Sequence, residues 1–282
     1  MKYAYYPGCT QEATAEEFGL SSVAVCRALG IELEEIPDWS CCGASSGHFE
    51  DDTLAHALSA RNLALAEQQQ LDTAVVCAAC YLRLRATRRK VRQSDDYRRK
   101  IVDTIGADYA GSYDVKHLLD IIVHDYGLNA LEKMVKKPLA GLRLVSYYGC
   151  YLVRPPKIVA FDDPENPTAM DRLAAALGAT PCDWSSKVDC CGGSLILGKE
   201  ELALGLIGGL LDNAREVQAD AIVVACPMCH ANLDMRQSGA AQLPVIYFTE
   251  LIGLALGLGD VDAWLKKHLV DPRPLLRSHK LL

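Results

Sequence analysis

Short apolar runs that end at cysteine are the first repeated feature along the chain. Two of them, Lys2 to Tyr6 and Arg143 to Tyr148, lead into Gly-Cys, and two others, Ala74 to Val76 and Ala221 to Val224, lead into Cys-x-x-Cys. Short runs of this kind, bounded by turn residues, are typical of buried strands. The sequence therefore predicts strands whose ends carry cysteine side chains.

Amphipathic stretches of helical length separate these runs. The segment from Thr14 to Leu29 has apolar residues on one face and a capping-box pattern at Thr14 and Glu17. This alternation predicts an α/β fold with two homologous lobes, each a mostly parallel sheet flanked by helices, with cluster ligands in loops at the strand ends. Helices also fit Pro167 to Leu177, Asp52 to Gln69 and Glu200 to Val217.

The cysteines are arranged as a duplicated motif. In each copy a Gly-Cys precedes a Cys-Cys-Gly, and a Cys-x-x-Cys follows 35 positions after the second cysteine of that pair. Chance does not reproduce this spacing, so the two halves are interpreted as copies of one unit. The first set is Cys9, Cys41, Cys42, Cys77 and Cys80; the second is Cys150, Cys190, Cys191, Cys226 and Cys229; Cys26 and Cys182 lie outside both sets.

The similarity extends beyond the cysteines. The tripeptide Asp38-Trp39-Ser40 in the first half corresponds to Asp183-Trp184-Ser185 in the second. The segment from Val115 to Asp120 resembles the one from Ile246 to Leu251 in pattern only. A boundary near Gly141 is therefore predicted, which gives a first domain over residues 1–140 and a second over residues 141–282.

Charge and targeting signals narrow the class of protein. A net charge of -7 argues against a general nucleic-acid binder, although Arg83 to Lys100 is strongly basic and is interpreted as a solvated helix face or a docking patch. The N-terminal segment lacks a secretory pattern, and no run of about 18 apolar residues could cross a bilayer, so a cytoplasmic location is expected. In a reducing compartment, 12 cysteines favour metal or redox chemistry over structural disulfides.

Five cysteines in each half favour iron–sulfur clusters over zinc. A structural zinc ion takes four ligands, which would leave one thiolate without a role. Adjacent cysteines diverge along the backbone and more naturally reach two irons of one cluster. Gly43 and Gly192 would permit a close turn, and helix N-termini after Cys42, Cys80, Cys191 and Cys229 would add amide donors. Zinc in one lobe and plain thiol redox chemistry remain alternatives.

These motifs resemble those of the tandem CCG-domain family, in the form of the B-type subunits of heterodisulfide reductases. The resemblance spans nearly the whole chain, and both copies of the motif are complete. It implies that the ten motif cysteines hold two noncubane [4Fe-4S] clusters and that a disulfide is cleaved between them. It also implies two partners, a small ferredoxin-like subunit of the C type and a flavoprotein subunit of the A type.

Disulfide reduction consumes two electrons, so two one-electron clusters facing one substrate match the stoichiometry. We hypothesise that the disulfide lies between the lobes, that each cluster donates one electron, and that iron holds each new thiolate before protonation. His48 and His230 are the candidate proton donors nearest the motifs. The alternative function is a relay of electrons for a dehydrogenase of the lactate, glycolate or succinate type, without disulfide chemistry.

A few residues near the motifs have other interpretations. Lys187, Arg154 and Lys157 could attract a negatively charged substrate, but exposed cations are common on any surface. Cys26 lies on an apolar helix face and is predicted to be a small core residue, whereas Cys182 has no assigned role.

Overall fold

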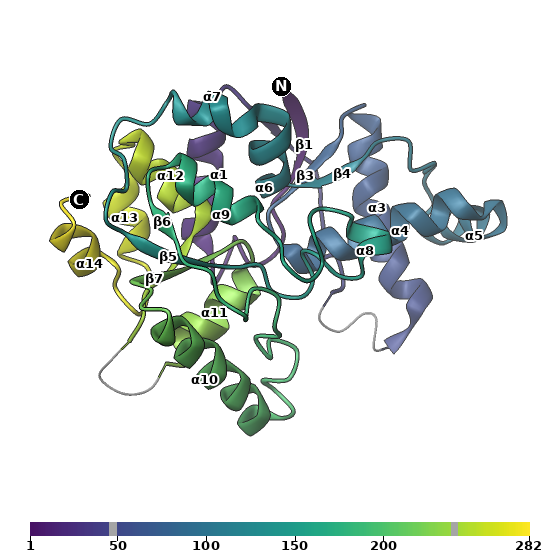
Figure 1. The fold of residues 1–282 in the computed structure, drawn as a ribbon. Coiled ribbons are helices and arrows are strands. Elements are labelled where there is room, and N and C mark those ends of the chain that lie inside the picture. Colours follow the sequence, from purple (N-terminus) through teal and green to yellow (C-terminus); the bar gives the residue numbers. More distant parts are fainter. Residues whose placement is uncertain (45–49, 238–241) are drawn as a thin grey trace.

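The computed structural model describes residues 1–44, 50–237 and 242–282 and contains two parallel sheets (Figure 1). Each sheet has four strands, in the order β2-β1-β3-β4 in the first half of the chain and β6-β5-β7-β8 in the second. The strand order is the same in both halves, and every strand pair is parallel. The prediction of two homologous α/β lobes is therefore confirmed.

The first lobe is built around one buried sheet. Its inner strands are short and almost wholly buried, as expected when helices cover both faces of a parallel sheet. The strands are β1 Lys2–Tyr6, β2 Glu32–Glu35, β3 Thr73–Val75 and β4 Val115–His117. The helices are α1 Glu16–Ala28, α3 Asp52–Gln68, α4 Ala78–Gln93, α5 Asp95–Ile105, α6 Leu118–Asp120, the π-helical turn η1 Ile121–Gly127, and α7 Leu128–Glu132.

The second lobe repeats this plan and adds two short helices at its C-terminal end. The strands are β5 Arg143–Tyr147, β6 Thr180–Pro181, β7 Ala221–Val224 and β8 Val245–Tyr247. The helices are α8 Pro156–Val159, α9 Ala169–Ala176, α10 Glu200–Glu216, α11 Pro227–Met235, α12 Phe248–Leu256, α13 Val261–Leu265 and α14 Arg273–Ser278.

Two local expectations differ from the structure. The capping box at Thr14 and Glu17 is wrong, because α1 begins at Glu16 after Ala15, which makes no side-chain cap, and Glu17 is buried. The match between the last strands is shifted by one position, since β4 begins at Val115 and β8 at Val245. Both errors arose where a helix start or a strand start depends on packing rather than on local pattern.

Helices of one lobe pack on helices of the other in a nearly reciprocal way. Helix α1 of the first lobe packs along α12 of the second, and α9 of the second lobe contacts α6 and α7 of the first (Figure 1). Because α1 and α9 are equivalent in the repeat, as are α6 and α12, the two sets of contacts mirror each other. Phe18 of α1 stacks on Tyr247 with ring centroids 4.1 Å apart, and the hydroxyls of Ser21 and Thr249 lie 2.7 Å apart. The lobes therefore share one continuous core.

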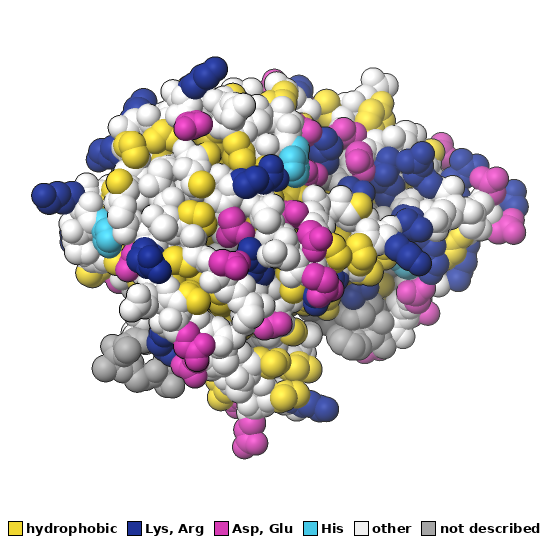
Figure 2. Space-filling model, in the orientation of Figure 1, with side chains coloured by type: hydrophobic (Ala, Val, Ile, Leu, Met, Phe, Trp, Pro, Cys, Tyr) yellow, Lys and Arg dark blue, Asp and Glu magenta, His cyan; other side chains and the backbone are white. Residues whose placement is uncertain are grey.

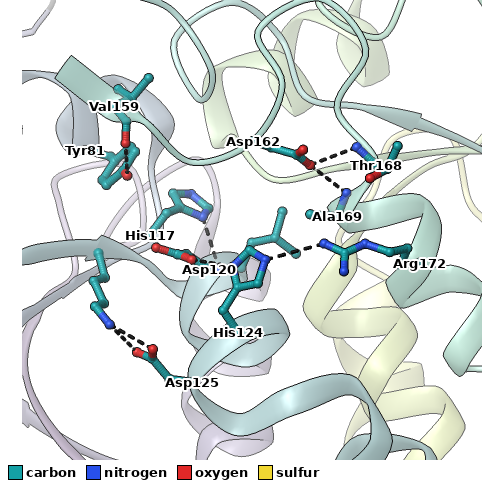
Figure 3. A network of polar contacts seen from close by, with 12 residues as sticks. Tyr81, His117, Asp120, His124, Asp125, Val159, Asp162, Thr168, Ala169 and Arg172 are labelled. Atoms are coloured by element: carbon teal, nitrogen blue, oxygen red, sulfur yellow. Dashed lines mark hydrogen bonds and ion pairs between the residues drawn. The ribbon is translucent and has the colours of Figure 1, made fainter. Parts of the chain in front are cut away.

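Polar contacts fix the other side of this junction (Figure 3). His124 Nδ1 lies 2.7 Å from Asp120 Oδ1, and His124 Nε2 lies 3.4 Å from the guanidinium of Arg172 in α9. The hydroxyl of Tyr81 in α4 donates to the carbonyl oxygen of Val159 in α8 at 2.9 Å. Hydrogen bonds of this kind define one relative orientation of the lobes.

Basic side chains gather over α4 and α5 (Figure 2). Many of them have acidic partners, such as Arg88 with Asp114 at 3.0 Å and Lys90 with Asp52 at 2.6 Å. This pairing agrees with the interpretation of the run as a solvated helix face. In the described part of the chain, no helix combines the length and the apolar character that crossing a bilayer requires.

Candidate metal centres

The motif cysteines lie where the parallel strands end. Cys9 follows β1, Cys77 follows β3, and Cys150 and Cys226 follow the equivalent strands β5 and β7. The carboxyl ends of parallel strands meet at one edge of a sheet, which is where α/β proteins form their sites. Cysteines that are far apart in the sequence are thereby brought together in each lobe.

The helix N-termini are placed differently from the prediction. Cys77 and Cys226 are themselves the N-caps of α4 and α11, so Cys80 and Cys229 lie within the first turns. After Cys191 the next helix begins only at Glu200. Unpaired first-turn N–H groups of a helix are therefore available beside the Cys-x-x-Cys pairs, whereas none of the described helices begins directly after Cys191.

The first centre groups the five cysteines of the first lobe. Cys42 Sγ lies 3.1 Å from Cys80 Sγ, and Cys9 Sγ lies 4.0 Å from Cys41 Sγ. The amide of Gly43 donates to Cys41 Sγ at 3.4 Å. Besides their interaction with each other, the adjacent cysteines have different partners, Cys9 for Cys41 and Cys80 for Cys42.

The second centre repeats this arrangement. Cys191 Sγ lies 3.6 Å from Cys229 Sγ, Cys150 is the hydrogen-bond partner of Cys190, and the amide of Gly192 donates to Cys190 Sγ at 3.3 Å. Within the described residues none of these sulfurs is in a disulfide. Each lobe therefore presents a set of free sulfur donors at one sheet edge.

The sulfurs compete for protons. Cys41 accepts hydrogen bonds from Cys42 and Cys9, and the bond from Cys42 is the main cause that lowers the pKa of Cys41 to about 2. The same hydrogen bonds to Cys41 raise the pKa of Cys9 and raise the pKa of Cys42 to about 11. In the second lobe the hydrogen bond with Cys150 lowers the pKa of Cys190 to about 6. One ionised sulfur suppresses the ionisation of its neighbours, so holding several thiolates together needs a cation. An all-sulfur donor set fits iron–sulfur clusters and other thiolate-binding metals.

The two centres meet across the lobe junction. The pKa of Cys77 is raised, and its hydrogen bond with Cys226 is the largest cause. The pKa of Cys226 is lowered, most by its hydrogen bond with Cys229 and next by the one with Cys77. Both side chains are buried. Cys77 and Cys226 occupy equivalent positions in the repeat. They therefore meet where pseudo-twofold symmetry relates the two lobes.

The outer side of each centre is open. Cys9, Cys41 and Cys190 are exposed and Cys150 is partly exposed, whereas all four Cys-x-x-Cys sulfurs are buried. A cavity of about 430 Å³ adjoins Cys9, and one of about 450 Å³ adjoins Cys150. The arrangement therefore has a shared interior side and two surface sides that a substrate could reach.

Glycine and tyrosine hold each Cys-Cys turn in place. Gly43 and Gly192 have φ of +74° and +72°, a conformation that disfavours any side chain. The hydroxyl of Tyr6 donates to the carbonyl oxygen of Ser40 at 2.8 Å, and Tyr147 donates to that of Asp189 at 2.7 Å. The sequence pattern did not reveal this tyrosine pair, although both tyrosines stand three positions before the first cysteine of their motif.

The other candidate residues have separate outcomes. His48 lies outside the described residues. His230 is buried, with Nε2 3.0 Å from His268 Nδ1 and its ring stacked on Tyr247. Sequence reasoning missed His268, because it has no counterpart in the repeat. The prediction that Cys26 is a core residue is confirmed, and the unassigned Cys182 is also buried.

Two of the three cations near the second motif have acidic partners. Lys187 is buried, with Nζ 2.9 Å from Asp171 and 3.0 Å from Asn166. Arg154 pairs with Glu165 at 2.6 Å, and Lys157 is exposed. Lys187 therefore stabilises the loop before Cys190 and is not free to attract a substrate.

Fold and site together define a class: a tandem α/β protein with one cysteine-rich site in each lobe. The chain belongs to the CCG cysteine-rich domain family, whose pattern it matches twice, over residues 3–85 and 144–234. Membership of this family and the all-sulfur donor sets indicate iron–sulfur clusters.

Relatives of this chain are components of reductases. It is 33% identical, over 97% of its length and 99% of the relative's, to the 8-methylmenaquinol:fumarate reductase membrane anchor subunit of Wolinella succinogenes. It is 29% identical, over 87% of its length and 86% of the relative's, to the B-type subunit of the ferredoxin:CoB-CoM heterodisulfide reductase of Methanosarcina mazei. A protein of Archaeoglobus profundus, described as similar to the same type of heterodisulfide reductase subunit, is 30% identical over 91% of each chain.

A crystal structure supports the fold alone. A hypothetical protein from Helicobacter pylori aligns with a TM-score of 0.72 over 95% of this chain and 51% of its own, at 11% sequence identity. The two-lobed architecture is thus found in a protein whose sequence is very different.

Proposed function

We propose that this chain is the catalytic iron–sulfur subunit of a heterodisulfide reductase-like complex. In this proposal the ten motif cysteines hold two noncubane [4Fe-4S] clusters, one in residues 1–140 and one in residues 141–282. The complex reduces a disulfide to two thiols with two electrons and two protons, or runs the reverse reaction. Bound clusters would supply the one-electron transfers.

The observation that carries the proposal is the pair of five-cysteine centres in two lobes that share one buried core, with Cys77 of one centre and Cys226 of the other near enough to shift each other's pKa. A disulfide needs two electrons, and two adjacent one-electron centres can deliver both without release of a radical intermediate to solvent. Two distant centres could not serve one substrate in this way. Two relatives, one a B-type subunit of a heterodisulfide reductase and the other described as similar to such a subunit, add independent support.

The protein groups have distinct tasks in this proposal. The buried cysteines Cys42, Cys77, Cys80 and their second-lobe equivalents anchor each centre, while Cys9 and Cys150 define the sides that face the surface. First-turn amides of α4 and α11 stabilise negative charge beside the Cys-x-x-Cys sulfurs. Electrons arrive from a small ferredoxin-like subunit of the C type and, before it, from a flavoprotein subunit of the A type.

A second candidate function rests on the fumarate reductase relative, which matches along almost its whole length. In that case the paired centres relay electrons for a dehydrogenase or reductase of the succinate type, and no disulfide is involved. The same cysteines would hold the clusters. The difference lies in what reaches the open sides of the centres.

One pair of assays separates the two functions. The anaerobic chain, with reduced methyl viologen as the electron donor, is given a mixed disulfide of two thiol coenzymes, and released thiol is measured. Thiol release that is lost when Cys77 and Cys226 are replaced by serine supports the first function. Absence of thiol release, together with reduction of fumarate when a flavoprotein partner is added, would establish the second.

A further inference from the structure

A buried cluster of histidine and carboxylate side chains lies behind the second centre. Helix α11 presents His230 and Asp234 on one face, one turn apart, and His268 follows α13. Their potential ligand atoms all lie within 4.8 Å of one another, and all three side chains are buried. None of them belongs to the cysteine motifs.

Three of the distances at this cluster match those between ligands of one ion. His230 Nε2 lies 3.0 Å from His268 Nδ1, and these two nitrogens lie 3.1 Å and 2.9 Å from the carbonyl oxygen of Val245. Ligand atoms about 2.1 Å from a common ion are separated by roughly 3.0–3.4 Å, depending on the coordination angle. The three atoms therefore form one face of a coordination polyhedron.

Hydrogen bonds alone do not satisfy this triangle. If only one nitrogen carries a proton, the lone pair of the other faces the Val245 oxygen, at 2.9 Å for His268 Nδ1 or at 3.1 Å for His230 Nε2. If both nitrogens carry protons to that oxygen, the two N–H groups oppose each other at 3.0 Å. Each arrangement leaves one repulsive edge, whereas a cation accepts all three lone pairs.

Acidic side chains gather around the cluster. Glu17, Asp234 and Glu250 are buried, and their carboxyl groups come from three different helices. Lys267 extends outward to Glu16 at 2.5 Å. A buried group of oxygen and nitrogen donors from separate elements is the kind of setting in which a divalent ion binds.

The outer contacts match those of metal-bound histidine. His268 Nε2 lies 2.9 Å from Glu250 Oε1, and the other oxygen of Glu250 accepts the amide of Tyr247 at 3.0 Å. A carboxylate that accepts the second N–H of a ligating histidine fixes its ring and raises its basicity. Asp234 is held in turn by the amides of Leu269 and Val270, at 2.8 and 3.1 Å.

We propose that His230, Asp234 and His268 bind a zinc-type divalent ion, with the carbonyl oxygen of Val245 as the fourth ligand, at a site separate from the two cysteine centres. Two nitrogens and two oxygens suit a borderline ion such as zinc better than a thiolate-seeking one. The ion joins the helix that carries Cys226 and Cys229 to β8 and the C-terminal segment. Its role is to hold that helix in position, and His230 is a ligand rather than a proton donor.

The test is metal analysis of the anaerobically purified chain together with zinc X-ray absorption. The expected result is about one zinc per chain in addition to iron, with a shell of nitrogen and oxygen at about 2.0–2.1 Å and no sulfur at about 2.3 Å. Zinc with sulfur ligands would place the metal in a cysteine centre and overturn the proposal. A chain with full iron and no zinc would overturn it as well and would leave only a hydrogen-bonded cluster.

Two variants and a control make the test specific. His268→Ala is expected to lose the zinc and keep the iron, because it touches no motif cysteine. His268→Cys is expected to retain zinc with one sulfur at about 2.3 Å, which covers the case in which the alanine variant does not fold. His124→Ala, at a partly exposed histidine of the first lobe, is the control and should change neither metal. Iron content reports on the cysteine centres independently.

Discussion

The two lobes share their sulfur donors but differ in the surfaces beside the outer cysteines. Each places five cysteines at the carboxyl edge of a sheet with the same strand order. The cavity beside Cys9 is lined by Glu12, Glu35 and Asp38, whereas the one beside Cys150 is lined by prolines, Tyr151 and an Arg154–Glu165 pair. Duplication has kept the cysteines, and the surfaces beside them have diverged. Under the proposed function, two equivalent electron carriers would face unlike halves of a substrate or unlike partners.

The largest effect is expected from removing the inner cysteines of one lobe. Cys226→Ala with Cys229→Ala, and separately Cys77→Ala with Cys80→Ala, should each halve the iron content and abolish disulfide reduction, because each centre supplies one of two electrons. Iron analysis and thiol release measure both. Full turnover by either double variant would show that one lobe suffices.

Substitution of Lys187 tests whether this cation stabilises the fold or binds the substrate. Lys187→Met leaves the partly buried Asp171 without its partner and should destabilise the chain by about 2–3 kcal/mol, below the cost of a fully buried unpaired charge. Arg154→Gln removes a more exposed pair and should cost at most about 1 kcal/mol. Denaturant unfolding gives both values. If instead Lys187→Met changed KM for an anionic disulfide while stability stayed unchanged, Lys187 would be a substrate contact.

The glycines of the two Cys-Cys-Gly turns should respond unequally to alanine. Both have positive φ, which costs an added side chain about 1–2 kcal/mol. A Cβ at Gly192 would lie 2.9 Å from the backbone of Ala203, whereas one at Gly43 would meet the movable side chain of Leu58 at the same distance. Gly192→Ala should therefore cost roughly 1–3 kcal/mol more than Gly43→Ala and lose more iron. Equal losses would show that the two turns are equally tight.

The smallest effect is expected from the tyrosines that hold the turns. Tyr6→Phe and Tyr147→Phe each remove one hydrogen bond to a carbonyl oxygen and should each cost about 1 kcal/mol. Thermal unfolding of the two variants provides the comparison. A loss several times larger in one lobe would mean that its hydroxyl does more than hold the turn.

Local pattern in the sequence predicted the elements that do not depend on distant packing. The apolar runs predicted the inner strands β1, β3, β5 and β7, and the repeat predicted the two lobes and the grouping of cysteines. The edge strands β2 and β6 were not predicted, because they have no apolar run. The contact between Cys77 and Cys226 was not predictable, because it depends on how α1 packs against α12 and α9 against α6. The cluster around His268 was missed for a similar reason, since a single histidine 38 positions after His230 forms no motif. The assignment of the ten cysteines as ligands and the boundary near Gly141 stay predictions.

Iron and sulfide analysis of the anaerobically isolated chain, combined with Mössbauer spectroscopy, tests the central claim most directly. Two occupied centres predict about eight iron atoms per chain, and the variant without Cys226 and Cys229 should retain about four. Zinc bound by sulfur with no iron, or iron that is unchanged in that variant, would contradict the claim that both lobes carry a cluster.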